Sequence, residues 1–600
     1  MGLMKQAYDT YCFMEKQYAG AYSSEMKEPL VPVSHQIVKV DLVLTLDAEG
    51  RLLTASSFGK DAMPIIIPVT EQSAGRTSGT ACAHPLCDQL RFFTPLYPQR
   101  YEAYLTQLHD WQHSPYGHPK LDAIAAYVEQ GTILQDLEKL GLIELDEKGF
   151  PTKEKLRVCW RVETGQAGEE TEKDCWKDRT LFDSFISYYA STKSEEPVYC
   201  MISGTYGPPA IQHPKKIISN NANAKLISSN DTSGFTYRGR FADDTQAVTI
   251  SYDASQKIHN ALHWLAANQG ELIGGRTFLC WNPQGVALPK LNTPFQRSKS
   301  VRRKYSEYQK DLKNALHGWQ EQIPRDAQAV VAAFDAATTG RLALTYYSEM
   351  TGGDFLERLH HWDNTCCWYH FPYGIQSPSL YQIMDCAFGT LRSAQGKAKF
   401  ETDDRVLRQQ IQRLISCRVD KAKLPADFVK GVVQKASNLQ ILPDRTMKET
   451  VLFTACAVIR KYHYDNFEEE WSMALEPEKK DISYQYGRLL AVFEKIEKDT
   501  YESTETRETN AIRMQAVFVQ RPQWAAAKIY EKLRNAYFSK LKWAGQQADY
   551  HKLIGQIMEQ ISQFSDREQK SSLKDTYLMG YYLQRNELYK SKETAQEEEV

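Results

Sequence analysis

The sequence has no long apolar stretch. None of its hydrophobic runs approaches the roughly 20 residues that a membrane-spanning helix needs, and no apolar core or cleavage site of a secretory signal follows the first residues. Its twelve cysteines follow no regular spacing, which is typical of buried thiols in a reducing compartment. These absences predict a cytoplasmic protein that does not contact the membrane.

The chain also lacks an excess of charge of either sign. Lys and Arg number 73 against 75 Asp and Glu, a formal net charge of -2. Any binding of nucleic acid must therefore come from local basic clusters. The hydrophobic fraction of 42% is enough to form buried cores, and 600 residues exceed what one core usually organises, so several domains are expected.

Motifs of catalysis are missing as well. No P-loop, HExxH or GxSxG sequence occurs. The cysteines nearest to histidines lack the paired spacing of structural zinc ligands, which favours buried thiols. They are Cys82 and Cys87 around His84, and Cys366 and Cys367 near His360, His361 and His370.

Carboxylate and histidine pairs give no better candidate. Asp243–Asp244 and Asp403–Asp404 fit loops or helix starts. His259 and His263, one helical turn apart, are interpreted as surface or interface histidines because no third ligand is indicated. The sequence therefore predicts no catalytic residue, no metal and no cofactor.

Hydrophobic periodicity divides the chain into two parts. Residues 38–46 and 156–162 predict strands, and residues 100–142 and 253–268 predict helices. Beyond Tyr305 the chain is expected to be predominantly helical. Four amphipathic runs near the end, joined by short polar loops, are typical of a bundle: 486–496, 524–543, 553–564 and 573–583.

The expected fold class is α+β. A mixed, β-rich N-terminal part with irregular loops precedes a predominantly helical C-terminal bundle. The expected domains are residues 1–310, a mainly helical connecting region 311–472, and the bundle 473–600.

Residues 225–241 combine hydroxyl and amide side chains with glycines, aromatics and arginines. Such groups bond phosphates or base edges, and glycines let backbone N–H groups approach closely. Arg238 and Arg240 lie on one side of an extended segment, suited to phosphates or a narrow minor groove. An ordinary Ser/Asn-rich turn is the alternative. The candidate nucleic-acid-binding residues are Lys225, Ser228, Ser229, Asn230, Thr232, Ser233, Tyr237, Arg238 and Arg240.

Other basic or polar positions extend this set. Arg76 stands between glycines at the end of a predicted strand, and residues 296–313 carry seven basic residues against two acidic ones, although a solvated helix face explains that run equally well. The additional candidates are Arg76, Thr77, Ser78, Lys215, Lys216, Lys257, Asn260, Arg297, Lys299, Arg302, Arg303 and Lys304.

Several short motifs follow one another along the chain. They are RTSG at 76–79, PLCD at 85–88, SNDTSGFTYRGRF at 229–241, ISY at 250–252, ALHWL at 261–265, GGRT at 274–277 and YYSE at 346–349. In this order they resemble the large subunit of the type I-C CRISPR Cascade surveillance complex.

The resemblance implies a non-catalytic subunit that recognises the protospacer-adjacent motif (PAM) in double-stranded DNA. Such a subunit promotes strand separation and R-loop formation, stabilises the displaced strand and helps recruit the Cas3 helicase-nuclease. The implied partners are the guide CRISPR RNA, the target DNA, Cas3, and the backbone, handle-binding and small subunits of Cascade. A metal-dependent nuclease or RNA-processing enzyme is the alternative function.

Under this resemblance, the Arg76 loop and residues 228–240 are expected at the PAM-proximal duplex. Lys215, Lys216 and residues 297–304 are expected to contact the displaced strand. The C-terminal region resembles the small-subunit portion of the family, with Met473 as candidate internal start and Met447 less well placed. Its basic residues, for which a solvated helix face is the alternative, are Arg488, Arg513, Lys528, Lys532, Arg534, Lys540 and Lys542.

Overall fold

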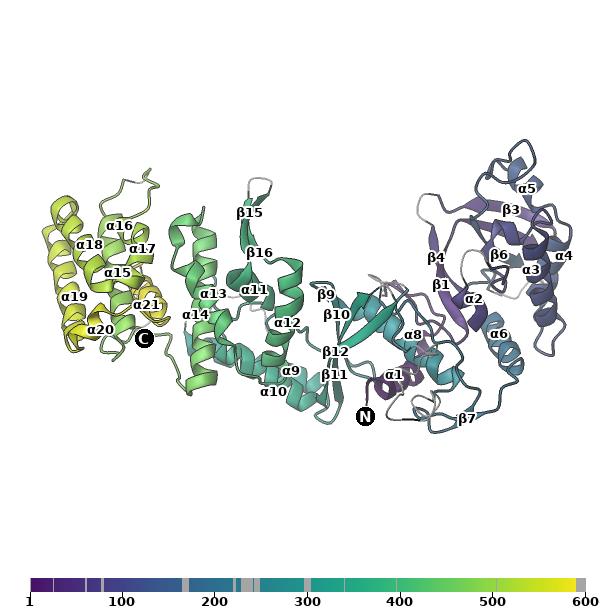
Figure 1. The fold of residues 1–600 in the computed structure, drawn as a ribbon, viewed down its shortest axis with the longest axis horizontal. Helices are drawn as coiled ribbons and strands as arrows, with labels where there is room; N and C mark the ends of the chain where they lie inside the picture. Colours follow the sequence, from purple (N-terminus) through teal and green to yellow (C-terminus); the bar gives the residue numbers. More distant parts are fainter. Residues whose placement is uncertain are drawn as a thin grey trace. The chain divides into compact units, whose positions relative to one another are not determined.

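The computed structural model describes residues 2–24, 26–59, 62–76, 80–164, 172–218, 223–227, 241, 249–295, 304–338, 340–394, 397–502 and 504–589. The chain forms two compact units. The first comprises residues 1–287 and 328–349, and the second comprises residues 288–327 and 350–600. Small sheets lie in the N-terminal half and the C-terminal region is largely helical, which confirms the expected α+β class (Figure 1).

The first unit contains a four-stranded sheet covered by helices. Its strand order is β3 (Leu52–Ser57), β2 (Leu42–Asp47), β6 (Arg157–Glu163) and β5 (Asp88–Gln89), with β2 and β6 parallel. Buried residues of β2 and β6 share a core with α3 (Pro98–Gln112), α4 (Pro119–Glu129), α5 (Ile133–Lys139) and α6 (Arg179–Ser191). The predicted strand at 156–162 and the predicted helices at 100–142 are confirmed.

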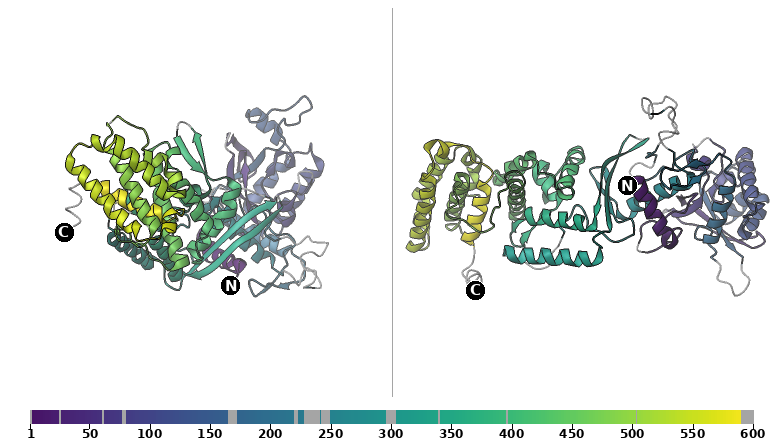
Figure 2. Two further views of the ribbon diagram at one scale, coloured as in Figure 1. Left: turned by 60° about the vertical axis from the view of Figure 1, so that its left-hand side comes forward. Right: turned by 90° about the horizontal axis from the view of Figure 1, so that it is seen from below.

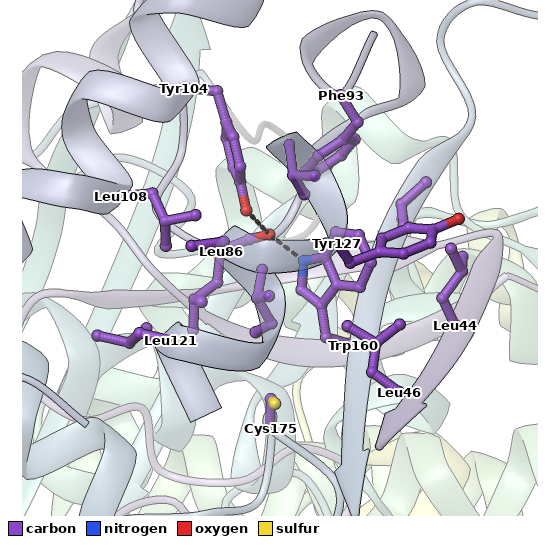
Figure 3. Packing of buried hydrophobic residues seen from close by; sticks show 14 of the residues in the cluster. Leu44, Leu46, Leu86, Phe93, Tyr104, Leu108, Leu121, Tyr127, Trp160 and Cys175 are labelled. Atoms are coloured by element: carbon purple, nitrogen blue, oxygen red, sulfur yellow. Dashed lines mark hydrogen bonds between the residues drawn. The ribbon is translucent and has the colours of Figure 1, made fainter. Parts of the chain in front are cut away.

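Two aromatic side chains in this core hold one backbone carbonyl (Figure 3). Trp160 Nε1 and Tyr104 Oη donate to the Leu86 carbonyl oxygen at 2.6 and 2.9 Å. Leu86 has a φ of 61°, a left-handed conformation that a branched residue adopts only when its surroundings enforce it. The pair of hydrogen bonds fixes the turn that leads to Asp88.

The strand predicted at 38–46 is two strands that belong to different sheets. β1 (His35–Val40) pairs with β4 (Met63–Pro68) in a two-stranded sheet, whereas β2 continues the four-stranded sheet. The chain changes sheets at Asp41, whose side chain accepts a hydrogen bond from the Arg157 backbone N–H at 2.8 Å. Val38 and Val40 pack with Ile65 and Ile67, while Leu44 lies in the other core. The residues of this apolar run are therefore buried in two separate cores.

A second core in this unit lies between helices and a sheet. α1 (Leu3–Tyr18) packs on α8 (Tyr252–Gln269), and the sheet order is β12 (Arg341–Thr351), β11 (Gln328–Thr338), β10 (Arg276–Trp281), β9 (Glu271–Ile273). Helix α8 confirms the prediction at 253–268. The predominantly helical part beyond Tyr305 also contains the strands β11 and β12, because the fully buried residues from Val330 to Phe334 pair with β10.

Short elements complete the first unit. They are a two-stranded hairpin and a five-residue helix. Their bounds are α2 (Glu71–Gly75), β7 (Val198–Tyr199) and β8 (Tyr206–Gly207).

The second unit is mainly helical, and its last helices form the predicted bundle (Figures 1 and 2). α15 (Ile482–Lys498) and α21 (Tyr577–Tyr589) pack with their backbones close together, because a Cβ at Gly487 or Gly580 would collide with the backbone of the facing helix. The predicted run at 524–543 ends earlier, at Ala536. The helices are α9 (Tyr305–Gln322), α10 (Gly352–Thr365), α11 (Leu380–Phe388), α12 (Asp404–Val419), α13 (Ala426–Ala436), α14 (Arg445–Phe467), α15 (Ile482–Lys498), α16 (Asn510–Arg513), α17 (Gln515–Gln520), α18 (Pro522–Ala536), α19 (Ala544–Ser562), α20 (Asp566–Lys570) and α21 (Tyr577–Tyr589); the hairpins are β13 (Trp368–His370) with β14 (Gly374–Gln376), and β15 (Thr390–Ala394) with β16 (Lys397–Glu401).

Candidate nucleic-acid interface

A cleft of about 260 Å³ in the first unit gathers basic side chains from segments far apart in the sequence. Its lining comes from β1, α2, the turn after residue 80, the start of β6, Lys215, Lys216 and Asn223. We call it the basic cleft and define it by its five cations. They are Arg76, Arg91, Arg157, Lys215 and Lys216.

Arg76, a predicted nucleic-acid contact, is held inside the protein. Its guanidinium donates to both carboxylate oxygens of Asp88 and to the Cys82 carbonyl oxygen, with 2.6 Å between Nη1 and Asp88 Oδ2. It also lies 4.9 Å above the ring of Phe92. Asp88 is fully buried and the Arg76 side chain is 12% exposed. Arg76 therefore ties the two ends of the 76–88 loop together, whatever else it contacts.

Arg91, another cation of the basic cleft, also has a carboxylate partner. Glu154 accepts a hydrogen bond from Arg91 at 3.2 Å. Arg157, Lys215 and Lys216 have no carboxylate partner within the residues that the structure describes. Three cations without counter-ions on one concave surface form a site suited to phosphate groups.

The surroundings of Lys216 reflect this excess of positive charge. Burial lowers the pKa of Lys216, and Lys215 and Arg157 lower it further. Its φ is 69°, a left-handed conformation that is costly for a residue with a side chain. An anion in the basic cleft would relieve the repulsion that this arrangement creates.

His84 is a buried residue that lines the basic cleft. Its pKa is well below the usual value because the ring is buried, and Arg76, Arg157, Lys216 and Lys215 lower it further. The structure gives its buried Nδ1 no partner among the described residues. A neutral imidazole adds no charge to the site and leaves the cations to set its potential.

One carboxylate joins the two segments that meet at the basic cleft. Glu71, at the start of α2, accepts hydrogen bonds through Oε1 from the backbone N–H groups of Ile211 and Gln212 at 3.0 and 2.9 Å. Its other oxygen accepts from Lys193 Nζ. The segment that carries Lys215 and Lys216 is thereby fixed beside the helix that leads to Arg76.

Three more predicted residues lie in the first unit, outside the basic cleft. Lys225 lines an adjoining cavity with Lys215 and Lys216, and burial and Lys215 lower its pKa. Lys257 forms ion pairs with Asp253 at 3.2 Å and Glu15 at 3.6 Å. The Asn260 amide donates to the carbonyl oxygens of residues 31 and 32, both at 3.1 Å. Lys257 and Asn260 thus have structural partners of their own.

Many predicted residues fall outside the described part of the chain. They are Thr77, Ser78, Ser228, Ser229, Asn230, Thr232, Ser233, Tyr237, Arg238, Arg240, Arg297, Lys299, Arg302 and Arg303. Lys304 is described, belongs to the second unit, and is exposed at the start of α9.

Sequence reasoning missed Arg91, Arg157 and His84 as members of the site. Arg157 opens a strand whose alternation predicts only β structure, and Arg91 lies in a short turn. Arg91, Arg157 and Lys215 lie far apart in the sequence, so no local pattern connects them. The nearest signal is the PLCD motif at 85–88, which contains the carboxylate that binds Arg76.

The histidine pair on α8 was interpreted wrongly in one respect. His259 is 1% exposed and therefore buried, whereas His263 is partly exposed and contacts Glu28 at 2.7 Å. In the described residues, no three His, Cys, Asp or Glu side chains are grouped to hold a metal ion. Burial raises the pKa of Cys82 and of Cys87, so both are thiols at neutral pH.

The basic residues of the C-terminal bundle separate into two kinds. Arg488 is buried on α15, where it donates to Gln584 Oε1 at 3.0 Å and to the Pro477 carbonyl oxygen at 2.7 Å. The others are exposed: Arg513, Lys528, Lys532, Arg534, Lys540 and Lys542. Within the described residues, no helix is long and apolar enough to cross a membrane.

Comparison with family models agrees with the motif order. Residues 15–589 match the family described as CRISPR-associated protein (Cas_Csd1). The chain belongs to this family. Csd1 proteins, also called Cas8c, are the large subunits of type I-C Cascade and are generally non-catalytic, which places this chain in a Cascade context. No curated protein matches the chain.

Proposed function

We propose that this Csd1 protein recognises the PAM in double-stranded DNA, and that its basic cleft binds the backbone of the duplex beside that motif. The observation that carries the proposal is the group of Arg157, Lys215 and Lys216 without carboxylate partners in the described part of the chain. Phosphate contacts position a protein on DNA, and a concave surface that presents several fixed cations supplies them.

One of the segments predicted to read the DNA is flanked on both sides by residues that line this cleft. Arg76 and Thr80, which flank residues 77–79, both line it, and so does Asn223, next to residues 219–222. Lys225 precedes residues 228–240. In this proposal Thr77, Ser78 and the polar residues of 228–240 approach base edges, while Arg238 and Arg240 hold phosphates. Readout in the minor groove would tolerate several related motifs.

Arg76 has a different part in the proposal from the one its sequence suggests. Because Asp88, the Cys82 carbonyl and Phe92 already surround its guanidinium, we assign it a positioning role. It fixes both ends of the loop that presents Thr77 and Ser78. Lys215 and Lys216, expected at the displaced strand, are reassigned to the duplex backbone because they share the basic cleft with Arg157.

The remaining family roles extend the proposal beyond the first unit. The subunit promotes strand separation and R-loop formation with the guide CRISPR RNA, and helps recruit the Cas3 helicase-nuclease. Lys304 and the basic run before it contact the displaced strand. The exposed cations of the C-terminal bundle, among them Lys528 and Lys532, add backbone contacts in the manner of a small subunit.

The test is charge reversal in the basic cleft. In the assembled complex, the triple variant Arg157→Glu, Lys215→Glu, Lys216→Glu should lose binding of PAM-containing duplex at moderate salt. The slope of log affinity against log salt should fall by about 3, roughly one unit for each phosphate contact removed. Equilibrium binding measured at four or more salt concentrations gives both quantities.

A matched triple variant distinguishes the effect of the cleft residues from the effect of a change in net charge. Lys139, Lys148 and Lys153 are exposed and do not line the basic cleft. Their replacement by Glu changes the net charge equally and should leave the salt slope unchanged. Equal losses in the two triple variants would refute the assignment of the cleft.

A further inference from the structure

A second cavity adjoins the basic cleft. It has a volume of about 180 Å³ and lies between β1, α2, residues 212–216 and one face of α8. The two share the lining residues Gln36, Ala74, Lys215 and Lys216. The lysines therefore stand at the junction, where one bound strand can contact both.

Helix α8 forms the wall opposite the lysines. Gln256, His259, Asn260 and His263 are spaced by three and four residues, which places them on one face of the helix. Tyr252 contributes an aromatic ring one turn earlier, and residues from other segments complete the wall. We call this the histidine cavity, after His35, His213, His259 and His263.

Several polar atoms of the histidine cavity lack partners. His213 Nδ1 is 2.8 Å from Ser255 Oγ, and the buried His35 Nε2 and His263 Nδ1 have no hydrogen-bond partner among the described residues. His259 Nδ1 must carry the proton that it donates to the Ser255 carbonyl oxygen at 2.7 Å, so its buried Nε2 is an acceptor, also without a described partner. Buried polar groups are normally hydrogen-bonded. These atoms point to a ligand that carries both donors and acceptors.

Gln256 adds to this set. Its side chain is mostly buried, and among the described residues its amide has neither a donor nor an acceptor opposite it. An amide offers two donors and one acceptor in a plane, the pattern that matches the edge of a heterocyclic base.

The side of the histidine cavity lined by His213 and His259 is neutral, whereas the side lined by the lysines is cationic. Burial lowers the pKa of His213 to about 3 and that of His259 to about 4, so both rings are uncharged at neutral pH. Glu71 is engaged by Lys193 and two backbone N–H groups, and Glu28 by His263. Lys215, Lys216 and Lys225 remain without carboxylate partners in the described chain. Such a site fits a flat polar ring attached to an anion.

The volume limits the size of the ring. A cavity of about 150 Å³ holds one benzene molecule, so the histidine cavity has room for a single heterocycle and excludes a whole nucleotide. The sugar and phosphate would stay outside it, beside the lysines. Bases that have no pairing partner are those extruded at least cost.

From this geometry we infer that the histidine cavity receives the base of one unpaired nucleotide, while the phosphate of that nucleotide lies on Lys215, Lys216 and Lys225. This inference rests on the proposed function, because the backbone must run through the basic cleft. His213 and Gln256 hydrogen-bond the base, and Tyr252 supplies an aromatic wall.

The experiment is a scan with single abasic substitutions in the assembled complex. Each unpaired position of the guide RNA and of the displaced DNA strand is replaced in turn, and affinity for the PAM-containing target is measured. One position should weaken binding about tenfold, the loss typical of one base contact. A 2-aminopurine at that position should change its emission on binding.

Two conservative variants connect the position to the cavity. Gln256→Met and His213→Phe keep the side-chain volume and remove hydrogen bonds. In both variants the abasic substitution should therefore cause almost no further loss of affinity. Gln269→Met, on the exposed end of α8, is the control and should keep the full penalty. If one of the two variants fails to assemble, the other makes the same comparison.

The outcomes separate the inference from the proposed function. No sensitive position, or a penalty that persists in both cavity variants, would overturn the inference while the charge-reversal result stands. Free mononucleotides that bind as tightly as the strand would show a small-molecule site instead, and would also overturn it. Normal duplex binding by the charge-reversal triple would overturn both.

Discussion

Arg76 and Asp88 form a two-fold hydrogen-bonded ion pair in which the carboxylate is fully buried. The pair closes the loop between the strand that ends at Pro68 and the turn at Leu86. Removing one member of a buried ion pair leaves the other charge without a partner, which lowers the free energy of unfolding by about 3 to 5 kcal/mol. The pair is therefore a structural element first, and its effect on DNA binding follows from the loop that it holds.

Asp88→Asn should lower the free energy of unfolding of the first unit by about 3 kcal/mol, because Arg76 loses its charged partner. Chemical denaturation followed by near-UV circular dichroism measures the change. Arg51→Ala, which removes an ion pair that is 72% exposed on the arginine side, is the control and should leave unfolding unchanged. Equal effects of the two substitutions would contradict the structural role of the buried pair.

Arg76→Lys tests how Arg76 acts on DNA. A lysine keeps the positive charge but cannot donate to both oxygens of Asp88 in a fixed fork. If Arg76 positions the loop, Arg76→Lys should weaken duplex binding nearly as much as Arg76→Ala, by tenfold or more. A phosphate contact would instead tolerate lysine with a loss below about threefold. Binding of the assembled complex to PAM-containing duplex distinguishes the two.

The first unit should lose stability in mild acid. His35, His213 and His259 are buried, and burial lowers their pKa values to about 4, 3 and 4 from 6.5. Above pH 6.5 both the folded and the unfolded chain hold these rings neutral. As the pH falls from 6.5 toward 4, these histidines become protonated in the unfolded chain but stay neutral in the folded one. Each histidine then costs about 1.4 kcal/mol per pH unit.

Denaturation at pH 7.5, 6.0 and 5.0 measures this loss. His259→Gln keeps the donor to the Ser255 carbonyl and removes one titrating group. As the pH falls, the free energy of unfolding of this variant should decrease less steeply than that of the unsubstituted protein. The difference in slope should correspond to the uptake of about one proton fewer on unfolding. Parallel pH profiles would show that His259 is not held neutral.

His463 links α14 to the start of α21 and should make that contact pH-dependent in the opposite direction. Burial opposes its charge, but hydrogen bonds to Asp575 and Glu469 outweigh burial and leave the pKa of His463 raised above 6.5. Its stabilising contribution is complete below pH 6.5 and is lost as the pH rises through the raised value. The two ion pairs measure 3.1 Å to Asp575 and 2.8 Å to Glu469.

His463→Gln should remove this dependence. The thermal midpoint of the unsubstituted protein should fall between pH 6.5 and 8.5, and that of the variant should be lower at pH 6.5 and flatter across the range. His551→Gln, on α19, is the matched control. A variant that keeps the full decline would contradict the assignment to His463.

An internal start at Met473 would yield a product that contains the whole C-terminal bundle. Met473 lies between the end of α14 at Phe467 and the start of α15 at Ile482, so the product would begin in a connection. Met447 lies inside α14, and a product begun there would carry most of that helix. Met473→Leu should abolish a short C-terminally tagged product on an immunoblot, whereas Met447→Leu should leave it unchanged. Persistence of the short product in the Met473 variant would exclude this start.

Local periodicity was enough to predict several elements. The apolar positions Ile258, Leu262 and Leu265 recur at helical spacing and lie in the core on α8, and the alternation before Trp160 gives β6. The order of short motifs was enough for the family, because a match from residue 15 to residue 589 depends on sequence alone. These features are encoded within windows of a few residues or in their linear order.

Other features depend on contacts between distant residues. The apolar run 38–46 does not reveal that the chain changes sheets at Asp41, because the partners Ile65 and Trp160 decide it. The buried run from Ala329 to Phe334 becomes a strand because β10 is there to pair with it.

The cations of the basic cleft show most clearly what the sequence determines and what depends on the tertiary structure. The sequence by itself determined the family, the α+β class and the presence of basic residues such as Arg76 and Lys216. Only the tertiary structure decided that Asp88 engages Arg76, while Arg157 joins Lys215 and Lys216 with no carboxylate partner among the described residues. The physical reason is that the charge of a side chain is fixed by its chemistry, whereas its availability to a ligand depends on which groups the fold brings within hydrogen-bonding distance.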